Sequence, residues 1–256
     1  MRWLAVGLGA LLAATATGAD ELSRVPSGAR TPDVTVRATG ERKQEIGRSV
    51  DGRPIIARRW GERGAERTVL VVGSIHGDEA EGHRVVFELT GPRLARFDGV
   101  EVWTVPTVNP DGVAARTRGN ARGVDLNRNF PVGWKAIPPS SGYYSGPEPA
   151  SEPETRDVLR FLRRIRPELT VWYHQPWGQT LIPCEGGGRR VALRYARLSG
   201  LQARDCFPSP PGSATRWQRE RQDAKAFVVE LQGGELSAST VRRHARALRQ
   251  IAAPRT

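Results

Sequence analysis

Short apolar runs alternate with stretches in which apolar residues recur at helical spacing. Residues 68–75 form a short continuous apolar run, which is typical of a strand buried on both faces, and strands are also predicted at 100–108, 169–174 and 226–231. Three longer segments are predicted to be helical, at 80–96, 151–165 and 237–252. Strands that alternate with helices predict an α/β fold with a mainly parallel or mixed sheet.

Turn and cap residues refine these elements. Asp51-Gly52 is a two-residue turn signal between strand-like flanks, so "IGRSVDGRPIIARRWG" is predicted to form a hairpin. Ser151 and Glu154 have the spacing of a capping box, which predicts a helix start at that point. The apolar face of that helix is expected to consist of Val158, Leu159, Leu162 and Ile165.

The N-terminal residues have the pattern of a secretory signal peptide. Arg2 precedes an apolar run from Trp3 to Ala13, and the small residues of "ATATGA" allow cleavage after Ala16 or Ala19. The run is too short to span a bilayer comfortably, although an uncleaved N-terminal anchor is an alternative. We expect a signal peptide at 1–19, a flexible lead-in at 20–42 and one domain at 43–256. The mature protein is then secreted, periplasmic or in the cell envelope, without stable membrane insertion.

Composition adds a strong positive charge. The formal net charge is +12, and because only three of the basic residues are lysines, the excess is almost all arginine. Such a protein would be attracted to anionic polymers, although high arginine usage also reflects genome base composition. The arginines are scattered, without a basic arm or an aromatic-basic array, so no nucleic-acid partner is expected.

Cysteine usage agrees with export. Cys184 and Cys206 are the only cysteines, and an even pair in an oxidising compartment is a candidate disulfide. Two unpaired buried thiols are the alternative.

Four residues that can bind a metal or transfer a proton fall at the carboxyl ends of predicted strands. His76 and Glu79 follow the first strand, His174 closes the third, and Glu230 lies near the end of the fourth. Ligands bind at this edge of open α/β sheets, and His₂Glu is an established zinc ligand set. By itself an H-x-x-E spacing is more often a solvated turn, but a second histidine at a strand end favours a zinc site.

The remaining catalytic chemistry needs a base and a binding site for the substrate. Glu230 is an acid in an otherwise apolar strand, where either catalysis or a structural ion pair explains it. The segment "RTRGNARGVDLNRNF" lies in a long loop at 109–150 that is rich in Gly, Pro, Asn and Asp, and loops of that length are usually functional. Its arginines can pair bidentately with a substrate carboxylate, and its asparagines add neutral donors.

These motifs together resemble a known family. "HGDE", "NPDG", "GVDLNRNFP", "SEPET" and "VVEL", in this order, are similar to the zinc carboxypeptidases, the M14 metallopeptidases, over roughly Ile46 to Gly234. Within this family, "NARGVDLNRNFP", "GPEPASEPET" and "PGSATRW" resemble the bacterial murein peptide amidase branch, which cleaves the γ-D-glutamyl-diaminopimelate bond of peptidoglycan peptides. That branch is familiar from the cytoplasm, whereas this chain has the pattern of an exported protein.

The resemblance implies an α/β/α fold, with a mixed, mainly parallel sheet flanked by helices, and one Zn²⁺ per chain. His76, Glu79 and His174 match the zinc ligands, and Glu230 matches the general base and acid. Arg118 matches the arginine that polarises the scissile carbonyl, although its neighbours Arg116 and Arg122 are alternatives. The pair that holds the terminal carboxylate of the substrate is matched by Asn127 and Arg128.

The sequence therefore predicts an exported zinc peptidase or amidase that acts on peptides or peptidoglycan fragments next to a free carboxylate. An N-acyl amino acid deacylase of the aspartoacylase type and a catalytically dead wall-peptide binder are the alternatives. The substrate-capping tyrosine of the family, the side-chain specificity pocket and the oligomeric state are not assigned. We expect Trp217 to be core, or else a pocket wall. We also expect loop packing for Tyr143 and Tyr144 and surface positions for His83 and His244.

Overall fold

The computed structural model of the chain describes residues 42–90, 97–184 and 186–253. The predicted signal peptide and all but the last residue of the predicted lead-in lie outside these ranges, as does the end of the helix expected at 80–96. Arg42, which was assigned to the lead-in, begins the first strand. No helix among the described residues is both long and apolar enough to cross a membrane.

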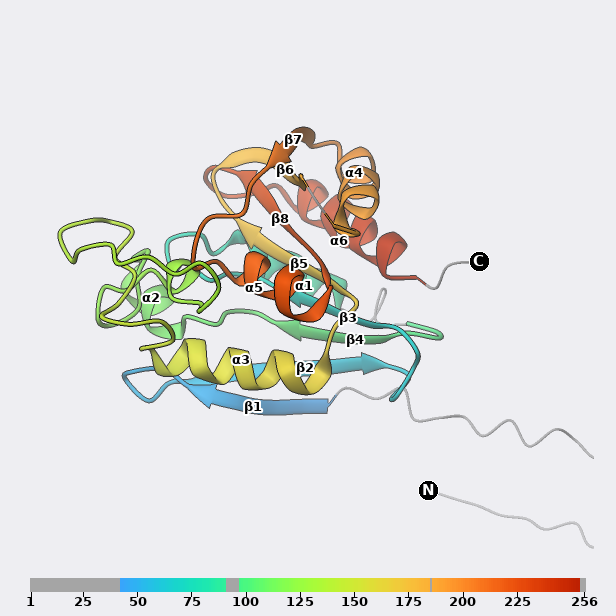
Figure 1. The fold of residues 1–256 in the computed structure, drawn as a ribbon. Helices are drawn as coiled ribbons and strands as arrows, with labels where there is room; N and C mark the ends of the chain where they lie inside the picture. The colour runs from blue at the N-terminus through green and yellow to red at the C-terminus, as the bar shows by residue number, and fades with distance from the viewer. Residues whose placement is uncertain (1–41, 91–96, 185, 254–256) are drawn as a thin grey trace, which may run out of the picture. The chain divides into compact units, whose positions relative to one another are not determined.

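In the described part of the chain, eight strands form one sheet in the order β1-β2-β4-β3-β5-β8-β6-β7 (Figure 1). The strands are β1 (Arg42–Arg48), β2 (Pro54–Gly61), β3 (Thr68–Val72), β4 (Glu101–Val105), β5 (Leu169–His174), β6 (Trp177–Pro183), β7 (Gln202–Phe207) and β8 (Lys225–Gln232). The four central strands β4, β3, β5 and β8 run parallel, as do β6 and β7. The pairs β1–β2, β2–β4 and β6–β8 are antiparallel, so the predicted mixed, mainly parallel sheet is confirmed.

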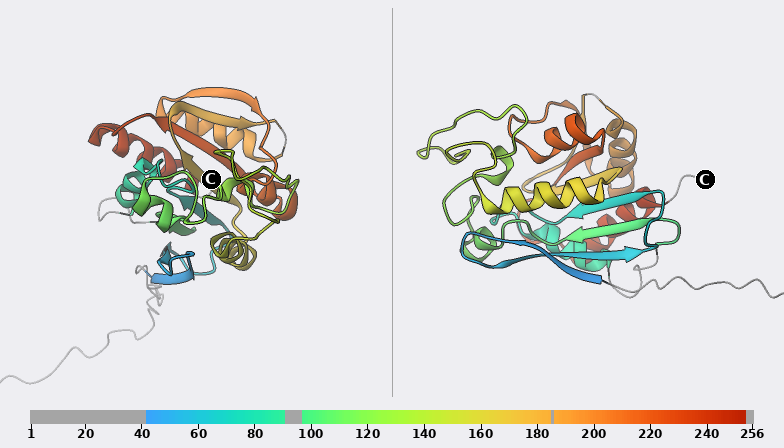
Figure 2. Two further views of the ribbon diagram at one scale, coloured as in Figure 1. Left: turned by 90° about the vertical axis from the view of Figure 1, so that its left-hand side faces the viewer. Right: turned by 60° about the horizontal axis from the view of Figure 1, so that its bottom comes forward.

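Helices cover both faces of this sheet. They are α1 (Glu81–Leu89), α2 (Pro110–Ala115), η1 (Leu126–Arg128), α3 (Pro153–Ile165), α4 (Gly188–Ser199), α5 (Ala214–Gln222) and α6 (Ala238–Ala252). Successive strand residues point to opposite faces. Val69 and Val71 of β3 therefore pack in one core with α1, α4 and α6, whereas Leu70 and Val72 pack in the other with α3 and α5. Figure 2 shows helices on both sides of the sheet.

The hairpin of β1 and β2 forms as predicted. Gly52 has a φ of 78°, a conformation that glycine adopts without strain, and the N–H of Ser49 donates to the carbonyl of Arg53 across the turn. The turn is fixed to the rest of the protein by Asp111, whose carboxylate accepts hydrogen bonds from the Ser49 hydroxyl at 2.7 Å and the Asp51 N–H at 3.0 Å. The hairpin is thereby connected to α2, which begins the site-bearing loop.

The capping box that was predicted at the start of α3 does not form. The N-cap residue is Glu152, which makes no side-chain capping hydrogen bond. The Ser151 hydroxyl instead donates to the Glu152 carboxylate and accepts from the side-chain amide of Asn129. Glu154 is fully buried and accepts from the N–H of Val50 and from Asn120. Tertiary contacts with the long loop therefore replace the local cap, while the predicted apolar face of α3 packs into the core.

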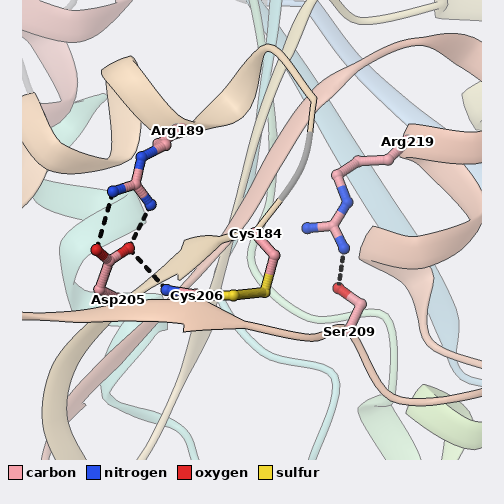
Figure 3. The surroundings of a disulfide bond; sticks show 6 residues. All are labelled: Cys184, Arg189, Asp205, Cys206, Ser209 and Arg219. Carbon is pink, nitrogen blue, oxygen red and sulfur yellow. Dashed lines mark hydrogen bonds and ion pairs between the residues drawn. A yellow bond between two sulfur atoms is a disulfide. The ribbon is translucent and has the colours of Figure 1, made fainter.

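The sequence patterns did not reveal the elements between residues 175 and 222, namely β6, α4, β7 and α5. The predicted disulfide lies in this region and is confirmed, because Cys184 and Cys206 are bonded. It connects the end of β6 to β7 (Figure 3). Next to the disulfide, Arg189 of α4 forms a bidentate ion pair with Asp205. These cross-links fix the segment that follows Cys206, which becomes one wall of the site.

Candidate active site

The predicted strand-end residues meet at the carboxyl ends of the parallel strands. His76 and Glu79 lie in the turn after β3, and His174 is the last residue of β5. Glu230 of β8 is directly opposite His174 in the strand register. Gly77 allows the turn to pack closely, since a Cβ there would overlap the backbone of Gly112 in α2.

Three of these side chains point at one another. Nδ1 of His76 lies 2.9 Å from Oε1 of Glu79, Nδ1 of His174 lies 2.8 Å from Oε2 of Glu79, and the two Nδ1 atoms are 3.2 Å apart. All three side chains are buried, with exposures of 1% for His76, 8% for Glu79 and 5% for His174. The two imidazoles and the carboxylate therefore surround one common point.

A buried carboxylate orients this cluster from behind. Asp125 is fully buried, and its Oδ1 lies 3.0 Å from Nε2 of His76. When Nε2 carries a proton for Asp125, Nδ1 is left as a lone pair that faces the common point. Burial raises the pKa of Asp125, but His76, Arg118 and Arg128 together lower it well below its usual range. Asp125 is thus an anion that fixes the His76 tautomer.

This donor set fits zinc. Nitrogen and oxygen ligands lie about 2.0–2.2 Å from zinc, so ligand atoms around one ion are roughly 3–3.5 Å apart, close to the spacings observed. Burial raises the pKa of Glu79, but the imidazoles of His174 and His76 reduce it well below its usual range, so the carboxylate is ionised. Burial lowers the pKa of His174, which favours its neutral, ligating form. The described residues contain one such cluster of histidine and acidic side chains, at His76, Glu79 and His174.

Glu230 lies beside the cluster without belonging to it. It is 7% exposed, and its Oε2 is buried with no hydrogen-bond partner among the described residues. Burial, and then the negative charge of Glu79, raise its pKa to about 7. A carboxyl group with such a pKa can both accept and donate a proton near neutral pH. The structural ion pair that was the alternative for Glu230 is not present among the described residues.

The long loop brings two arginines to the same place. Nε of Arg118 donates to Oδ2 of Asp125 at 3.0 Å, and its Nη1 donates to Oε1 of Glu79 at 3.2 Å. Nη1 of Arg128 lies 4.0 Å from Oδ2 of Asp125. Arg116 and Arg122, the alternatives to Arg118, are exposed and do not line the cavity. Of the arginines in this loop, Arg118 and Arg128 therefore line the cavity and contact Asp125, whereas Arg116 and Arg122 do not line it.

Asparagines hold the loop in place and contribute a donor. The Asn129 amide nitrogen donates to the carbonyls of Ser145 and Glu148, and so ties distant parts of the loop together. The Oδ1 of Asn127 accepts from the N–H of Ala214 at 3.1 Å, which leaves its amide nitrogen as the group it offers to the cavity. These buried hydrogen bonds give an irregular segment one conformation.

All seven of the predicted site residues line a single cavity of about 470 Å³. The sequence did not identify several other residues of its wall. Tyr143, assigned to loop packing, is 52% exposed and lines the cavity, so that assignment is wrong for this residue. Side chains after the disulfide and on α5 form another part of the wall, and they include Phe207, Ser209, Thr215 and Arg219. Figure 3 shows two of them, Ser209 and Arg219, whose guanidinium donates to the Ser209 hydroxyl. Asp125 was in a quoted motif, but only the fold shows its hydrogen bond to His76.

Two other expectations concern aromatic residues and histidines away from the cavity. Trp217 of α5 is 5% exposed and packs in the same core as residues of α3, as expected. The surface position expected for His244 is wrong, because this residue is fully buried and its Nδ1 bonds to the Tyr195 hydroxyl at 2.7 Å. His83 is half-buried and hydrogen-bonded to Ser74.

A comparison with protein families agrees with this site. Residues 39–183 match the family model described as zinc carboxypeptidase. Among curated proteins, carboxypeptidase SOL1 of Arabidopsis thaliana is 34% identical over 169 residues, and murein peptide amidase A of Escherichia coli K12 is 33% identical over 150 residues. These matches cover 60% and 52% of this chain, but only 33% of the first relative and 59% of the second, so this chain spans only part of the length of each.

Solved structures agree on the fold. A murein-tripeptide amidase from Escherichia coli O157 superposes with a TM-score of 0.66 and 25% identity, covering 84% of this chain and 92% of the other. A carboxypeptidase A from Helicoverpa armigera gives a TM-score of 0.71 with 17% identity, over 84% of this chain and 68% of the other. The second likeness is one of fold alone.

Proposed function

The chain belongs to the zinc carboxypeptidase family, and we propose that it is an exported hydrolase that cleaves an amide bond next to a residue with a free carboxylate, in peptides derived from peptidoglycan. A hydrolytic, zinc-dependent enzyme follows from the family and from the His-Glu-His cluster. Export and the peptidoglycan substrate are the parts of the proposal that go further. The signal-like N-terminus supports export, and the similarity to murein peptide amidase A supports the substrate.

One observation carries the proposal. A single cavity contains a metal-binding triad, a carboxyl group with a raised pKa and three arginines, of which Arg118 and Arg128 contact the buried Asp125 behind the triad. Amide hydrolysis needs these functions together, because water must be activated, negative charge must be stabilised and the leaving nitrogen must be protonated. A protein that only binds wall peptides has no need for this combination.

In the proposed mechanism, His76, Glu79 and His174 hold the metal. When bound, zinc supplies a Lewis acid that makes water more acidic and stabilises negative charge on the substrate carbonyl. Glu230 accepts the proton of the attacking water at its carboxylate and then delivers it to the leaving nitrogen. Its position directly opposite His174 in the sheet places it beside the triad for this transfer.

Arg118 and Arg128 are proposed to bind two different groups of the substrate. Arg118 is anchored by Glu79 and Asp125, and so its guanidinium lies next to the triad, where it can donate to the oxygen of the scissile carbonyl. Arg128 and the amide nitrogen of Asn127 hold the terminal carboxylate of the substrate. Arg128 is 17% exposed, which strengthens a charge-assisted contact relative to one at the open surface.

A panel of substrates tests the proposal. Purified protein with zinc is incubated with L-Ala-γ-D-Glu-diaminopimelate, with ordinary free-acid peptides, with the C-terminal amides of those peptides and with N-acyl amino acids. Products are identified by mass spectrometry. We expect release of diaminopimelate and much slower reaction of the amides. Cleavage of N-acyl amino acids alone would identify a deacylase, and the absence of any product would contradict the proposed hydrolysis.

A further inference from the structure

Tyr143 occupies an unusual position in the cavity wall. Its side chain is 52% exposed, yet the guanidinium carbons of Arg118 and Arg128 lie 4.9 Å and 5.2 Å from the centre of its ring. Both distances are within the range of a cation–π interaction, in which a cation is attracted to the electron-rich face of an aromatic ring. The neighbouring Tyr144 is half-buried and does not line the cavity.

The two guanidinium groups carry like charges, and carboxylates restrain them from one side only. Asp125 contacts both guanidinium groups from the buried side, at 3.0 Å for Arg118 and 4.0 Å for Arg128. Nη1 of Arg118 also donates to Oε1 of Glu79 at 3.2 Å, so Arg118 has two carboxylate partners. Both carboxylates are buried and limit the movement of the guanidinium groups on that side only. The ring of Tyr143 is the contact on the solvent side, where water would otherwise solvate the guanidinium groups and let them reorient.

We propose that Tyr143 is a positioning residue, whose ring holds Arg118 and Arg128 in the orientation that receives the substrate carboxylate and the scissile carbonyl. This inference rests on the proposed function for the roles of the two arginines. Tyr143 acts through the faces of its ring, so the hydroxyl is dispensable. It also acts through the arginines, so its removal affects carboxylate recognition more than metal binding or folding.

Three variants separate this role from general packing. Tyr143→Phe retains the ring, Tyr143→Leu removes it, and Tyr144→Leu is the matched control one residue away. Each is assayed on one peptide as the free acid and as the C-terminal amide. We expect Tyr143→Leu to reduce kcat/KM on the free acid roughly five- to thirty-fold, mainly through KM, and to weaken the preference for the free acid. Tyr143→Phe and Tyr144→Leu should both behave like the parent.

Two results would overturn the inference. If Tyr143→Phe is as impaired as Tyr143→Leu, the hydroxyl and not the ring is the active group. If Tyr143→Leu loses equal activity on the acid and the amide, the ring does not act through Arg128. Zinc content and the unfolding midpoint of each variant are measured alongside, and both should match the parent.

A second readout does not depend on turnover. In metal-free protein without substrate, the Nε–H signals of the two arginines are recorded by NMR and assigned with Arg118→Lys and Arg128→Lys. Protons over an aromatic face are shifted by its ring current, so Tyr143→Leu should move both signals and Tyr143→Phe neither. Unchanged signals in Tyr143→Leu would contradict the stacking. If the parent hydrolyses no peptide, the proposed function fails, but this measurement still tests the contact.

Discussion

Two buried polar clusters begin at consecutive residues of β5 and lie on opposite faces of the sheet. His174 belongs to the metal-binding cluster, with His76 and Glu79. The side chain of Tyr173 points into the core beneath α4 and α6, where its hydroxyl is 2.8 Å from that of Tyr195, which in turn bonds to His244. Each cluster contains at least one histidine that is fully or almost fully buried. We interpret only the first cluster as part of an active site.

The difference lies in the charge around the histidines. His76 is contacted by the carboxylates of Glu79 and Asp125, whereas the hydrogen-bond partner of His244 is a neutral hydroxyl. Burial accordingly lowers the pKa of His244 to about 4, and it raises that of Tyr195 well above its usual range. The second cluster is therefore neutral over the physiological range, and we interpret it as structural. A buried histidine alone is weak evidence of a site, and its carboxylate partners supply the stronger evidence.

The largest effect is expected from Glu230, the proposed proton-transfer group beside the metal-binding cluster. Glu230→Gln keeps the shape of the side chain but removes its basicity. Because general acid-base catalysis typically contributes 10²–10⁴-fold, kcat should fall by about that factor while zinc stays bound. Steady-state kinetics and elemental analysis of the same sample check this result.

The matched control is Asp78→Asn, because Asp78 also lines the cavity but is exposed. It should retain most of the activity of the parent. If Glu230→Gln binds zinc and keeps a near-parental kcat, Glu230 is not the base. Asp78 would then be the first candidate for that role.

The same carboxyl group predicts the pH dependence of activity. Glu230 must be ionised to accept a proton, and its pKa in the metal-free site is raised to about 7. Activity should therefore rise with pH along an acid limb, and the positive charge of zinc should place that limb below pH 7. A profile of kcat/KM against pH measures it. An activity that falls as pH rises from 5 to 7 would be inconsistent with Glu230 as the base.

A smaller loss is expected at the carboxylate-binding end of the cavity. Arg128→Ala removes a charge-assisted contact to the substrate, which should cost about 2–5 kcal/mol of transition-state binding. The variant should lose activity on free-acid peptides and discriminate little between them and their amides. Arg122→Ala is the control, since Arg122 is in the same loop but is exposed and paired with Glu152. An undiminished preference for the free acid would show that the assignment of Arg128 is wrong.

A substitution in the cluster of Tyr173, Tyr195 and His244 is expected to change stability and not catalysis. Folding lowers the pKa of His244 from 6.5 to about 4. Above pH 6.5 the imidazole is neutral in both states, and burying it carries no charge penalty. As the pH falls from 6.5 towards 4, the unfolded chain binds a proton at His244 and the folded protein does not, so the folded state becomes less stable relative to the unfolded state. The loss is at most about 3 kcal/mol. His244→Asn cannot be protonated, so its free energy of unfolding should depend less on pH over this interval. Denaturant unfolding at several pH values measures both slopes, and equal slopes would contradict the account of this cluster.

The contrast between the clusters also shows what the sequence could predict. The strand-end residues His76, His174 and Glu230 were identifiable because apolar runs define where buried strands end. His244 was assigned to the surface of the last helix, where it stands among arginines in "RRHARALRQ". Helical periodicity places it on the buried face with Val241, Ala245 and Leu248, so the signal was present in the pattern.

Other features could not be found from local patterns. Helix α4 contains four arginines, which weaken its apolar periodicity. Strand β7 is exposed along most of its length, and the first half of β6 includes a glycine and a glutamine, so neither strand shows a clear apolar run. The stacking of Tyr143 on two arginines depends on how a long irregular loop folds back, and buried asparagines decide this through tertiary hydrogen bonds. The replacement of the α3 capping box by contacts with that loop has the same cause.

Zinc content tests the central claim most directly, because the charged cluster is interpreted as a metal site and the neutral one is not. The protein is purified, dialysed against excess zinc and then against metal-free buffer, and the bound metal is measured by elemental analysis. We predict one zinc per chain for the parent and for His244→Asn, and strongly reduced zinc for His174→Ala. Full retention of tightly bound zinc by His174→Ala would contradict the assignment of His76, Glu79 and His174 as the metal site.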